Sequence, residues 1–249
     1  MAGHSHWANI ARKKAVVDNK RGKLWSKLSK AIIVAAKMGG GDADMNLRLR
    51  YAIDAAKAVS MPKENIQRAI KSGIGQLDGT NFEEILYEGY GAGGAAVLCE
   101  ILTDNRNRTA GEIRKIFELA DGKLGATGCV AWMFERKGLF LVPADKVDED
   151  RLLELTLEAG ADDVRRVDDK FEITCNPSVV SEVSTALETR SIPVDAKQIA
   201  RIPTSYVDLD AQTAPKVLAL MERLDDHDDV QSVASNFNIP QEALADSKN

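Results

Sequence analysis

The sequence predicts an α+β fold, in which a small helical N-terminal domain precedes two α/β, ferredoxin-like domains, one inserted in the other. Two observations support this prediction. The hydrophobic period is helical over the first 75 residues and becomes strand-like after residue 80. From Leu139 onward, the predicted elements follow the order β-α-β-β-α-β, which is the split arrangement of a ferredoxin-like unit.

Three short helices are expected in the first domain, residues 1–78. On the first helix, apolar side chains and lysines fall on opposite arcs, which is typical of a helix packed on one side. Asp44 caps the second helix, Pro62 occupies the first position of the third, and Gly73 lies beyond its end. These helices are predicted at residues 22–38, 44–59 and 62–72.

The rest of the chain is expected to form two domains. Residues 79–136 and 205–240 form one discontinuous α+β domain, because a lone C-terminal helix–strand pair cannot bury its apolar faces by itself. Residues 137–204 form the inserted ferredoxin-like domain. The predicted strands cover 83–90, 95–103, 164–167, 171–175, 197–202 and 230–237.

Three details of these two domains depend on local signals. A capping box, Thr109 with Glu112, begins a helix that runs to Leu119. Further helices are expected near residues 149–159, after Asn176-Pro177 and within the segment 211–229. The apolar runs 130–134 and 139–142 form either a strand pair or one long bent strand.

Charge is divided unevenly along this chain of 249 residues, whose net charge is −5. Residues 1–75 hold fifteen Lys/Arg and five Asp/Glu, a balance of +10, and the remaining 174 residues carry −15. A whole-chain charge therefore hides a strongly basic segment. This asymmetry predicts a polyanionic partner for the N-terminal part of the chain.

Composition excludes several classes of protein. With 44% hydrophobic and 29% charged residues, the chain is that of a globular protein. Its longest uncharged run, 230–241, is mostly polar, and no transmembrane segment or signal peptide is expected. Cys99, Cys129 and Cys175 suit neither a disulfide framework nor a zinc site, so a cytoplasmic chain without metal or cofactor is predicted.

The lysines of the first helix are the strongest functional signal, because no acidic residue accompanies them. Solvated helix faces usually mix Glu with Lys, so a nucleic-acid backbone is favoured over a merely solvated face and over an anionic membrane. Charge reversal at Lys23, Lys27 and Lys30, which point away from the apolar side, is expected to leave the fold intact. The predicted phosphate contacts are Lys13, Lys14, Lys20, Arg21, Lys23, Lys27 and Lys30.

The N-terminal arm is a second candidate contact. His4 and Trp7 could stack on bases or contact phosphates. Alternatively, Trp7 pins the arm to the helical domain. His4 and His6 alone do not complete a metal site.

Arg106 and Arg108 form a candidate secondary anion site. They lie beside the start of a predicted helix, where backbone N–H groups attract anions and arginine adds bidentate phosphate contacts. The alternative is a capped turn in which these arginines pair with acidic residues close in sequence, namely Asp104, Glu112 or Glu118.

Two other motifs have structural explanations. Residues 88–94 contain G-x-G-x-x-G, but a strand-like run follows, so a turn between strands is favoured over a dinucleotide site. Residues 225–229, Asp-Asp-His-Asp-Asp, lack the spacing of a cation-binding loop and are expected to form a solvated turn between helix and strand. No catalytic or metal-binding residue is predicted.

Seven short motifs are shared with a known family. They occur at residues 1–10, 18–23, 38–42, 61–62, 87–91, 103–109 and 130–134. Together they resemble the YebC/PmpR family of bacterial regulatory proteins from Met1 to about Pro240. The family pattern often has Pro where this chain has Ala43 and Leu47, and Ser where it has Cys129, which concerns loop rigidity more than the basic helix.

The resemblance implies a helical N-terminal domain followed by two α/β domains. It also implies a cytosolic DNA-binding transcriptional regulator, although mitochondrial relatives are similar to translational activators and bacterial members are linked to stalled ribosomes. We therefore expect a non-enzymatic nucleic-acid-binding regulator, with a ribosome-associated translation factor that binds ribosomal RNA as the alternative. The acidic α/β domains orient it or bind protein partners. A hydrolase has little support, because no nucleophile–base pair is recognisable.

Overall fold

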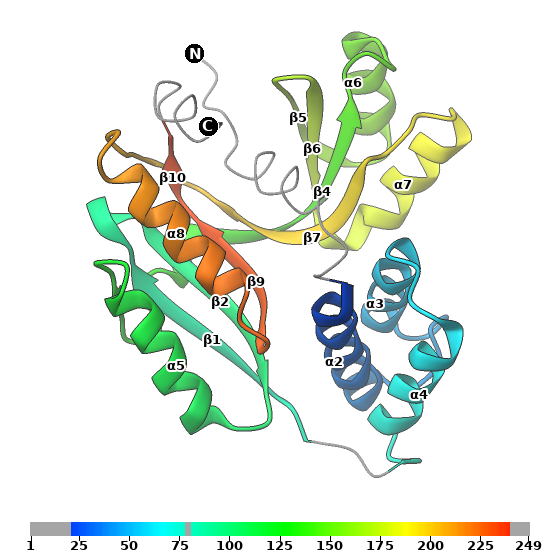
Figure 1. Cartoon of the computed structure of the whole chain (residues 1–249). Coiled ribbons are helices and arrows are strands. Elements are labelled where there is room, and N and C mark those ends of the chain that lie inside the picture. Colours follow the sequence, from blue (N-terminus) through cyan, green and yellow to red (C-terminus); the bar gives the residue numbers. More distant parts are fainter. Residues whose placement is uncertain (1–20, 78–80, 240–249) are drawn as a thin grey trace. The chain divides into compact units, whose positions relative to one another are not determined.

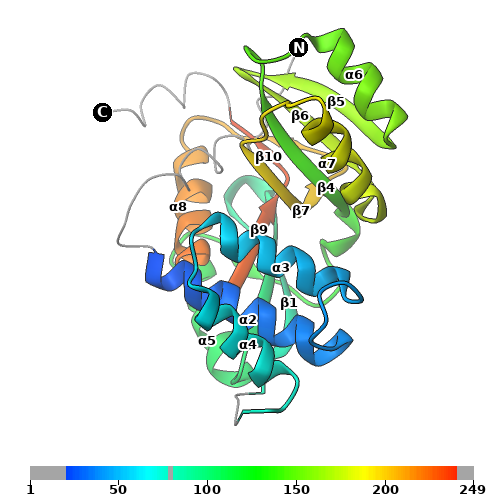
Figure 2. The same cartoon turned by 90° about the vertical axis from the view of Figure 1, so that its right-hand side faces the viewer.

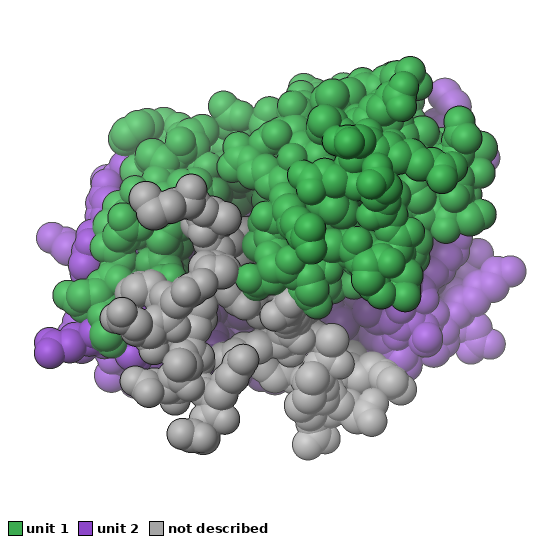
Figure 3. All heavy atoms as spheres, turned by 90° about the horizontal axis from the view of Figure 1, so that it is seen from above, with its two compact units in different colours: residues 1–16, 132–211, 236–249 green, residues 17–131, 212–235 purple. Residues whose placement is uncertain are grey.

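The computed structural model describes residues 21–77 and 81–239, and the chain divides into two compact units (Figure 3). Of the described residues, unit 1 comprises 132–211 and 236–239, and unit 2 comprises 21–77, 81–131 and 212–235. The fold class is α+β, as predicted. The three-domain division stays a prediction, because unit 2 includes both the helical segment and a β-sheet.

The helical segment of unit 2 is a three-helix bundle (Figure 2). Its core is formed by Ile32, Leu49 and Ile66, which are buried, and Trp25 packs against them. One side of each helix is apolar, so the bundle buries these sides together. The helices are α2 (Arg21–Gly39), α3 (Leu47–Ala58) and α4 (Lys63–Gly73).

The cap of α3 differs from the prediction. Asn46, and not Asp44, is the N-cap, and its side-chain oxygen accepts a hydrogen bond from the backbone N–H of Leu49. The amide nitrogen of Asn46 also donates to the carbonyl oxygens of Ala35 and Gly40. An amide both donates and accepts, so Asn46 can join the end of α2 to the start of α3, whereas a carboxylate at this position could only accept.

The second part of unit 2 is a four-stranded sheet with the order β3-β1-β2-β9 (Figure 1). Each neighbouring pair is antiparallel. α5 and α8 pack against each other and against this sheet, burying Phe117 and Leu220. The elements are β1 (Glu83–Tyr90), β2 (Ala96–Thr103), α5 (Arg106–Glu118), β3 (Lys123–Leu124), α8 (Ala214–Asp225) and β9 (Val230–Ser235).

The predicted capping box of α5 is wrong. Asn105 is the N-cap, and its side chain accepts from the backbone N–H of Arg108. Thr109 lies one turn inside the helix, where it is fully buried. The N-cap therefore lies four residues earlier than predicted, which brings Arg106 and Arg108 into the first turn of the helix.

Unit 1 contains the predicted ferredoxin-like arrangement (Figure 1). Its sheet has the order β5-β6-β4-β7, all antiparallel, and α6 and α7 pack against each other beside it. A Cβ on Gly138 of β4 would overlap Val180 at the start of α7, so glycine permits this close packing. The elements are β4 (Phe134–Pro143), α6 (Glu149–Glu158), β5 (Ala161–Val167), β6 (Lys170–Cys175), α7 (Val180–Thr189) and β7 (Ala196–Pro203).

Two of the expected strands take a different course. Of the two alternatives for the runs 130–134 and 139–142, one long strand is correct from Phe134 onward, because β4 runs without a break from Phe134 to Pro143. Residues 131–133 of the first run instead form a short 3-10 helix, Ala131–Met133. The predicted strand 230–237 is divided. β9 ends at Ser235 in unit 2, and β10 (Phe237–Asn238) pairs in parallel with β8 (Val207–Asp208) in unit 1.

Two helical glycines provide a matched test of the packing of α4 on α2. A Cβ at Gly73 of α4 would overlap the carbonyl oxygen of Ile33 and lie 2.7 Å from the Ala36 Cβ, whereas a Cβ at Gly111 of α5 meets nothing within 4 Å. We predict that Gly73→Ala lowers the free energy of unfolding by about 1–3 kcal/mol. Gly111→Ala should raise it by about 0.5–1 kcal/mol through helix propensity. Urea unfolding measures both, and equal effects would contradict the close α2–α4 approach.

Candidate nucleic-acid interface

The predicted lysine face lies on α2 of unit 2. Ile32, Ala35 and Ala36 of this helix are buried in the bundle core. Lys23, Lys27 and Lys30, spaced four and three residues apart, share another side of the helix. We call these three residues the lysine face.

The lysine face contacts the acidic turn, residues 225–229, which joins α8 to β9 in the same unit. The ammonium group of Lys23 donates to the carbonyl oxygen of Asp226 at 3.2 Å, and that of Lys27 donates to the carbonyl oxygen of Asp225. These carbonyls lie at the C-terminus of α8, where they have no partner within the helix and carry the negative end of its dipole. The lysines therefore stabilise the end of α8.

The third lysine reaches a buried carboxylate. Lys30 donates to the carbonyl oxygen of Asp228 at 3.1 Å and to a carboxylate oxygen of Asp229 at 2.6 Å. The side chains of Lys30 and Asp229 are only 15% and 5% exposed. The prediction of a solvated turn is thus wrong for Asp229, although it holds for Asp228, whose side chain is 71% exposed.

Asp229 is the centre of a hydrogen-bonded cluster. Its second carboxylate oxygen accepts from the hydroxyls of Thr103 at 3.0 Å and Thr109 at 2.8 Å, and from the guanidinium of Arg108 at 2.6 Å. With Lys30, these residues form what we call the Asp229 cluster. Burial alone would raise the pKa of Asp229, but the hydrogen bonds from Lys30, Thr109 and Arg108 hold this pKa well below its ordinary value.

This environment changes what charge reversal at the lysine face would do. Lys30→Glu would place two carboxylates side by side in a buried position, which is strongly unfavourable. The expectation that reversal of all three lysines leaves the fold intact therefore fails at Lys30. Lys23 is more tolerant, because its side chain is 54% exposed and its nearest carboxylate oxygen, on Asp228, is 3.9 Å away.

Arg108, one of the two residues of the candidate anion site, is already paired. Its guanidinium contacts Asp104 at 3.1 Å as well as Asp229, and Glu112 lies 3.9 Å away. Pairing with Asp104 and Glu112 was the alternative interpretation of the sequence, and the geometry favours it for Arg108. Arg106 is exposed in the same first turn of α5.

The acidic turn is also held by its histidine. The backbone N–H of Asp229 donates to His227 Nδ1 at 3.1 Å, so Nε2 carries the proton and faces Glu112 at 2.9 Å. Among the described residues, no group of three or more His, Cys, Asp or Glu side chains is arranged to hold a metal ion. The turn thus directs its backbone carbonyls and the side chains of His227 and Asp229 toward the protein, whereas Asp226 and Asp228 are exposed.

The glycine-rich motif is a turn between strands, as expected. β1 ends at Tyr90 and β2 begins at Ala96. Glu88 within it is buried, and its carboxylate accepts backbone N–H groups from Gly128, Val130 and Ala131. Burial alone would raise the pKa of Glu88, but these three hydrogen bonds lower it. Glu88 thereby holds the loop before β4, a role that its position in the glycine-rich motif did not indicate.

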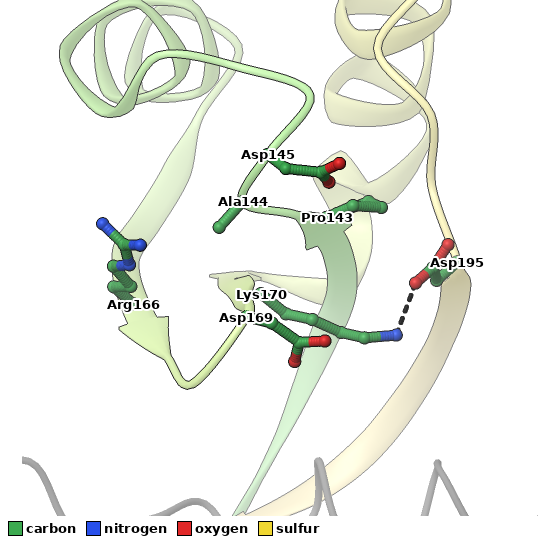
Figure 4. A pocket seen from close by; sticks show the side chains of 7 residues that line it. All are labelled: Pro143, Ala144, Asp145, Arg166, Asp169, Lys170 and Asp195. Atoms are coloured by element: carbon green, nitrogen blue, oxygen red, sulfur yellow. Dashed lines mark hydrogen bonds and ion pairs between the residues drawn. The ribbon is translucent and has the colours of Figure 1, made fainter.

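The remaining candidates for chemistry are engaged or shielded. Burial raises the pKa of the Cys175 thiol to about 11, and burial also raises the pKa of Cys99, so neither is an activated nucleophile. A hollow at one end of the unit 1 sheet is lined by acidic and basic side chains, and within it the Lys170 ammonium points at Asp195 and pairs with it (Figure 4). Arg166, at the edge of the same hollow, lies over the ring of Phe171.

Several predicted contact residues lie outside the described part of the chain. These are His4, Trp7, Lys13, Lys14 and Lys20, and for Arg21 only the backbone is described, as the first residue of α2.

None of the described helices is long and apolar enough to cross a membrane.

Two family models match almost the whole chain. The TACO1/YebC protein N-terminal domain matches residues 5–76, and the TACO1/YebC second and third domain matches residues 82–237. The chain belongs to the TACO1/YebC family. The family resemblance of its sequence motifs is therefore confirmed.

Similar proteins match this TACO1/YebC chain over nearly all of its length. A Rhodopirellula baltica protein named as a probable transcriptional regulatory protein is 56% identical over 247 residues, 99% of this chain and 100% of the relative. A protein of the same description from Geobacter sulfurreducens is 51% identical over 244 residues, 98% of both chains. The crystal structure of a conserved hypothetical protein from Aquifex aeolicus matches with a TM-score of 0.83 at 49% identity, covering 91% of this chain and 94% of that one.

The Asp229 cluster can be tested by a matched pair of variants. Asp229→Asn leaves Lys30 and Arg108 without their carboxylate, so we predict a loss of about 3–5 kcal/mol in the free energy of unfolding. Asp228→Asn, on the same turn but exposed, should cost less than about 0.5 kcal/mol. Urea unfolding at neutral pH measures both, and equal losses would contradict a special role for Asp229.

The same carboxylate predicts a pH dependence. Folding lowers the pKa of Asp229, so its contribution to stability is complete above the pKa of the unfolded chain, about 3.9, and is lost as pH falls through the folded-state pKa. The difference in unfolding free energy between wild type and Asp229→Asn should be constant above about pH 5 and shrink below about pH 4. A difference that stays constant down to about pH 2.5 would show that the Asp229 carboxylate is not the group responsible.

Proposed function

We propose that this chain is a cytoplasmic nucleic-acid-binding regulator without catalytic activity, and that duplex DNA is its target. The observation that carries the proposal is the division of charge, +10 over residues 1–75 against −15 over the rest. Nucleic-acid binding depends on phosphate neutralisation by Lys and Arg, so the N-terminal part is the half suited to it. The names of the relatives, which describe probable transcriptional regulatory proteins, support a regulatory role.

The acidic part of the chain has a different role in this proposal. Like-charge repulsion keeps phosphates away from a surface with a balance of −15. That part would orient the basic segment or bind protein partners. The contact residues we propose are Arg21 at the start of α2 and, beyond the described part, His4, Trp7, Lys13, Lys14 and Lys20.

Ribosomal RNA is the second candidate target, because its phosphates offer the same chemistry to the same residues. The full-length chain should be tested against random-sequence duplex DNA by fluorescence anisotropy and against ribosomes by co-sedimentation, each at several salt concentrations. We predict tighter binding to the duplex. If the chain bound ribosomes more strongly than duplex DNA at the same salt concentration, ribosomal RNA would replace duplex DNA as the proposed target.

A matched set of variants tests the phosphate contacts themselves. Replacing Lys13, Lys14 and Lys20 by Gln should flatten the slope of log affinity against log salt by about two to three units, because each lost contact to a duplex phosphate removes about 0.9. Replacing Lys115, Lys123 and Lys146, which are exposed lysines of the acidic part, should leave the slope unchanged. Equal slopes for both triple variants, or no measurable binding by the wild type, would refute the proposed function.

A further inference from the structure

The described helical segment, residues 22–77, carries ten basic side chains, and seven of them already have partners. Three form the lysine face on the acidic turn. The other four bind elsewhere in the same unit: Lys37 to Asn81, Arg48 to Glu84, Arg50 to the Ala43 carbonyl oxygen, and Lys57 to Asp54.

The remaining three basic residues all lie on α4. The side chains of Lys63, Arg68 and Lys71 are exposed, and none of these three side chains has a hydrogen bond or ion pair with any residue that the structure describes. The basic side chains of α2 and α3 in this segment thus have partners within the described part of the protein, whereas those of α4 do not.

α4 presents these residues on a firmly held surface. Ile66 and Ala69 are buried in the bundle core, which fixes the opposite side of the helix outward. Lys63, exposed Gln67 and Lys71 follow each other at four-residue intervals, so they form a row about 12 Å long, with Arg68 beside it. Glu64 is the acidic residue of this helix, and it lies in the first turn, where it complements the helix dipole.

The length and chemistry of this surface suit a nucleic-acid backbone. A row of about 12 Å covers several steps of a strand that rises 3.4 Å per nucleotide, so two lysines and an arginine can each reach a different phosphate. Gln67 offers an amide donor between the lysines. A membrane surface fits less well, because the apolar side of α4 is buried in the bundle and cannot enter lipid.

We propose that the α4 face, formed by Lys63, Gln67, Arg68 and Lys71, is the surface of the helical segment that contacts nucleic-acid phosphates. The lysine face of α2 is then an internal contact that holds the helical segment to the acidic turn. This inference rests on the proposed function and assigns it to a helix that the charge pattern of the sequence did not single out.

The test compares two triple variants of the full-length chain, each of which neutralises two lysines and one arginine of the helical segment. One variant changes the α4 face, with Lys63→Gln, Arg68→Gln and Lys71→Gln. The control changes exposed residues that have protein partners, with Lys37→Gln, Arg48→Gln and Lys57→Gln. Circular dichroism and urea unfolding establish that both variants are folded, and anisotropy with random-sequence duplex DNA measures affinity across a salt series.

The α4 variant should lose about two to three units of the salt slope, and the control should lose less than about one. The α4 assignment would be overturned if the α4 variant kept the wild-type salt slope, or if both variants lost the same amount of slope. Salt-dependent binding by the wild type would still support the proposed function in that case. Absence of salt-dependent binding by the wild type would instead refute the proposed function and the α4 face with it. An α4 variant that fails to fold is replaced by the three single substitutions, each of which should remove about 0.9 unit.

Discussion

The buried carboxylate of Asp229 is the constraint on which the architecture of unit 2 depends. A charge removed from water is tolerated only when hydrogen bonds and opposite charges replace its hydration. The partners of Asp229 come from three separate elements: Lys30 from α2, Thr103 from β2, and Arg108 with Thr109 from α5. The Asp229 carboxylate thereby joins the helical segment to the sheet. Separation of the two would leave this buried charge without some of its partners, which is unfavourable.

This cluster changes the meaning of three sequence motifs. From the sequence alone, the lysine helix suggested a polyanionic partner, the Arg-rich start of α5 suggested either an anion site or a capped turn, and the acidic turn was expected to be solvated. In the structure they satisfy one another, because lysines reach the turn and Arg108 reaches Asp229. The absence of acidic residues in α2 did indicate a negatively charged partner. For Lys23, Lys27 and Lys30, a partner of that kind lies in the same chain, about two hundred residues away.

Local features were predictable from the sequence, and long-range pairings were not. Periodicity and glycine breaks placed α2, β1 and the ferredoxin-like order correctly, because those signals come from neighbouring residues. The caps were missed where several polar residues compete, as when Asp42, Asp44 and Asn46 precede α3. Asp229 was missed because nothing in five consecutive polar residues tells which of them is buried. Asp229 is the buried residue of the turn because Thr103 and Lys30, which are remote in sequence, bind its carboxylate.

The central claim is that the lysine face is an internal contact and that α4 is the open basic surface, and lysine reactivity tests it most directly. The full-length chain is labelled with an amine-reactive reagent, with and without duplex DNA, and each lysine is quantified by mass spectrometry. Lys30 should react slowly in both states, whereas Lys63 and Lys71 should react quickly alone and become protected by DNA. The claim would be contradicted if Lys27 and Lys30 reacted quickly in the chain alone and DNA protected these two lysines but not Lys63 and Lys71.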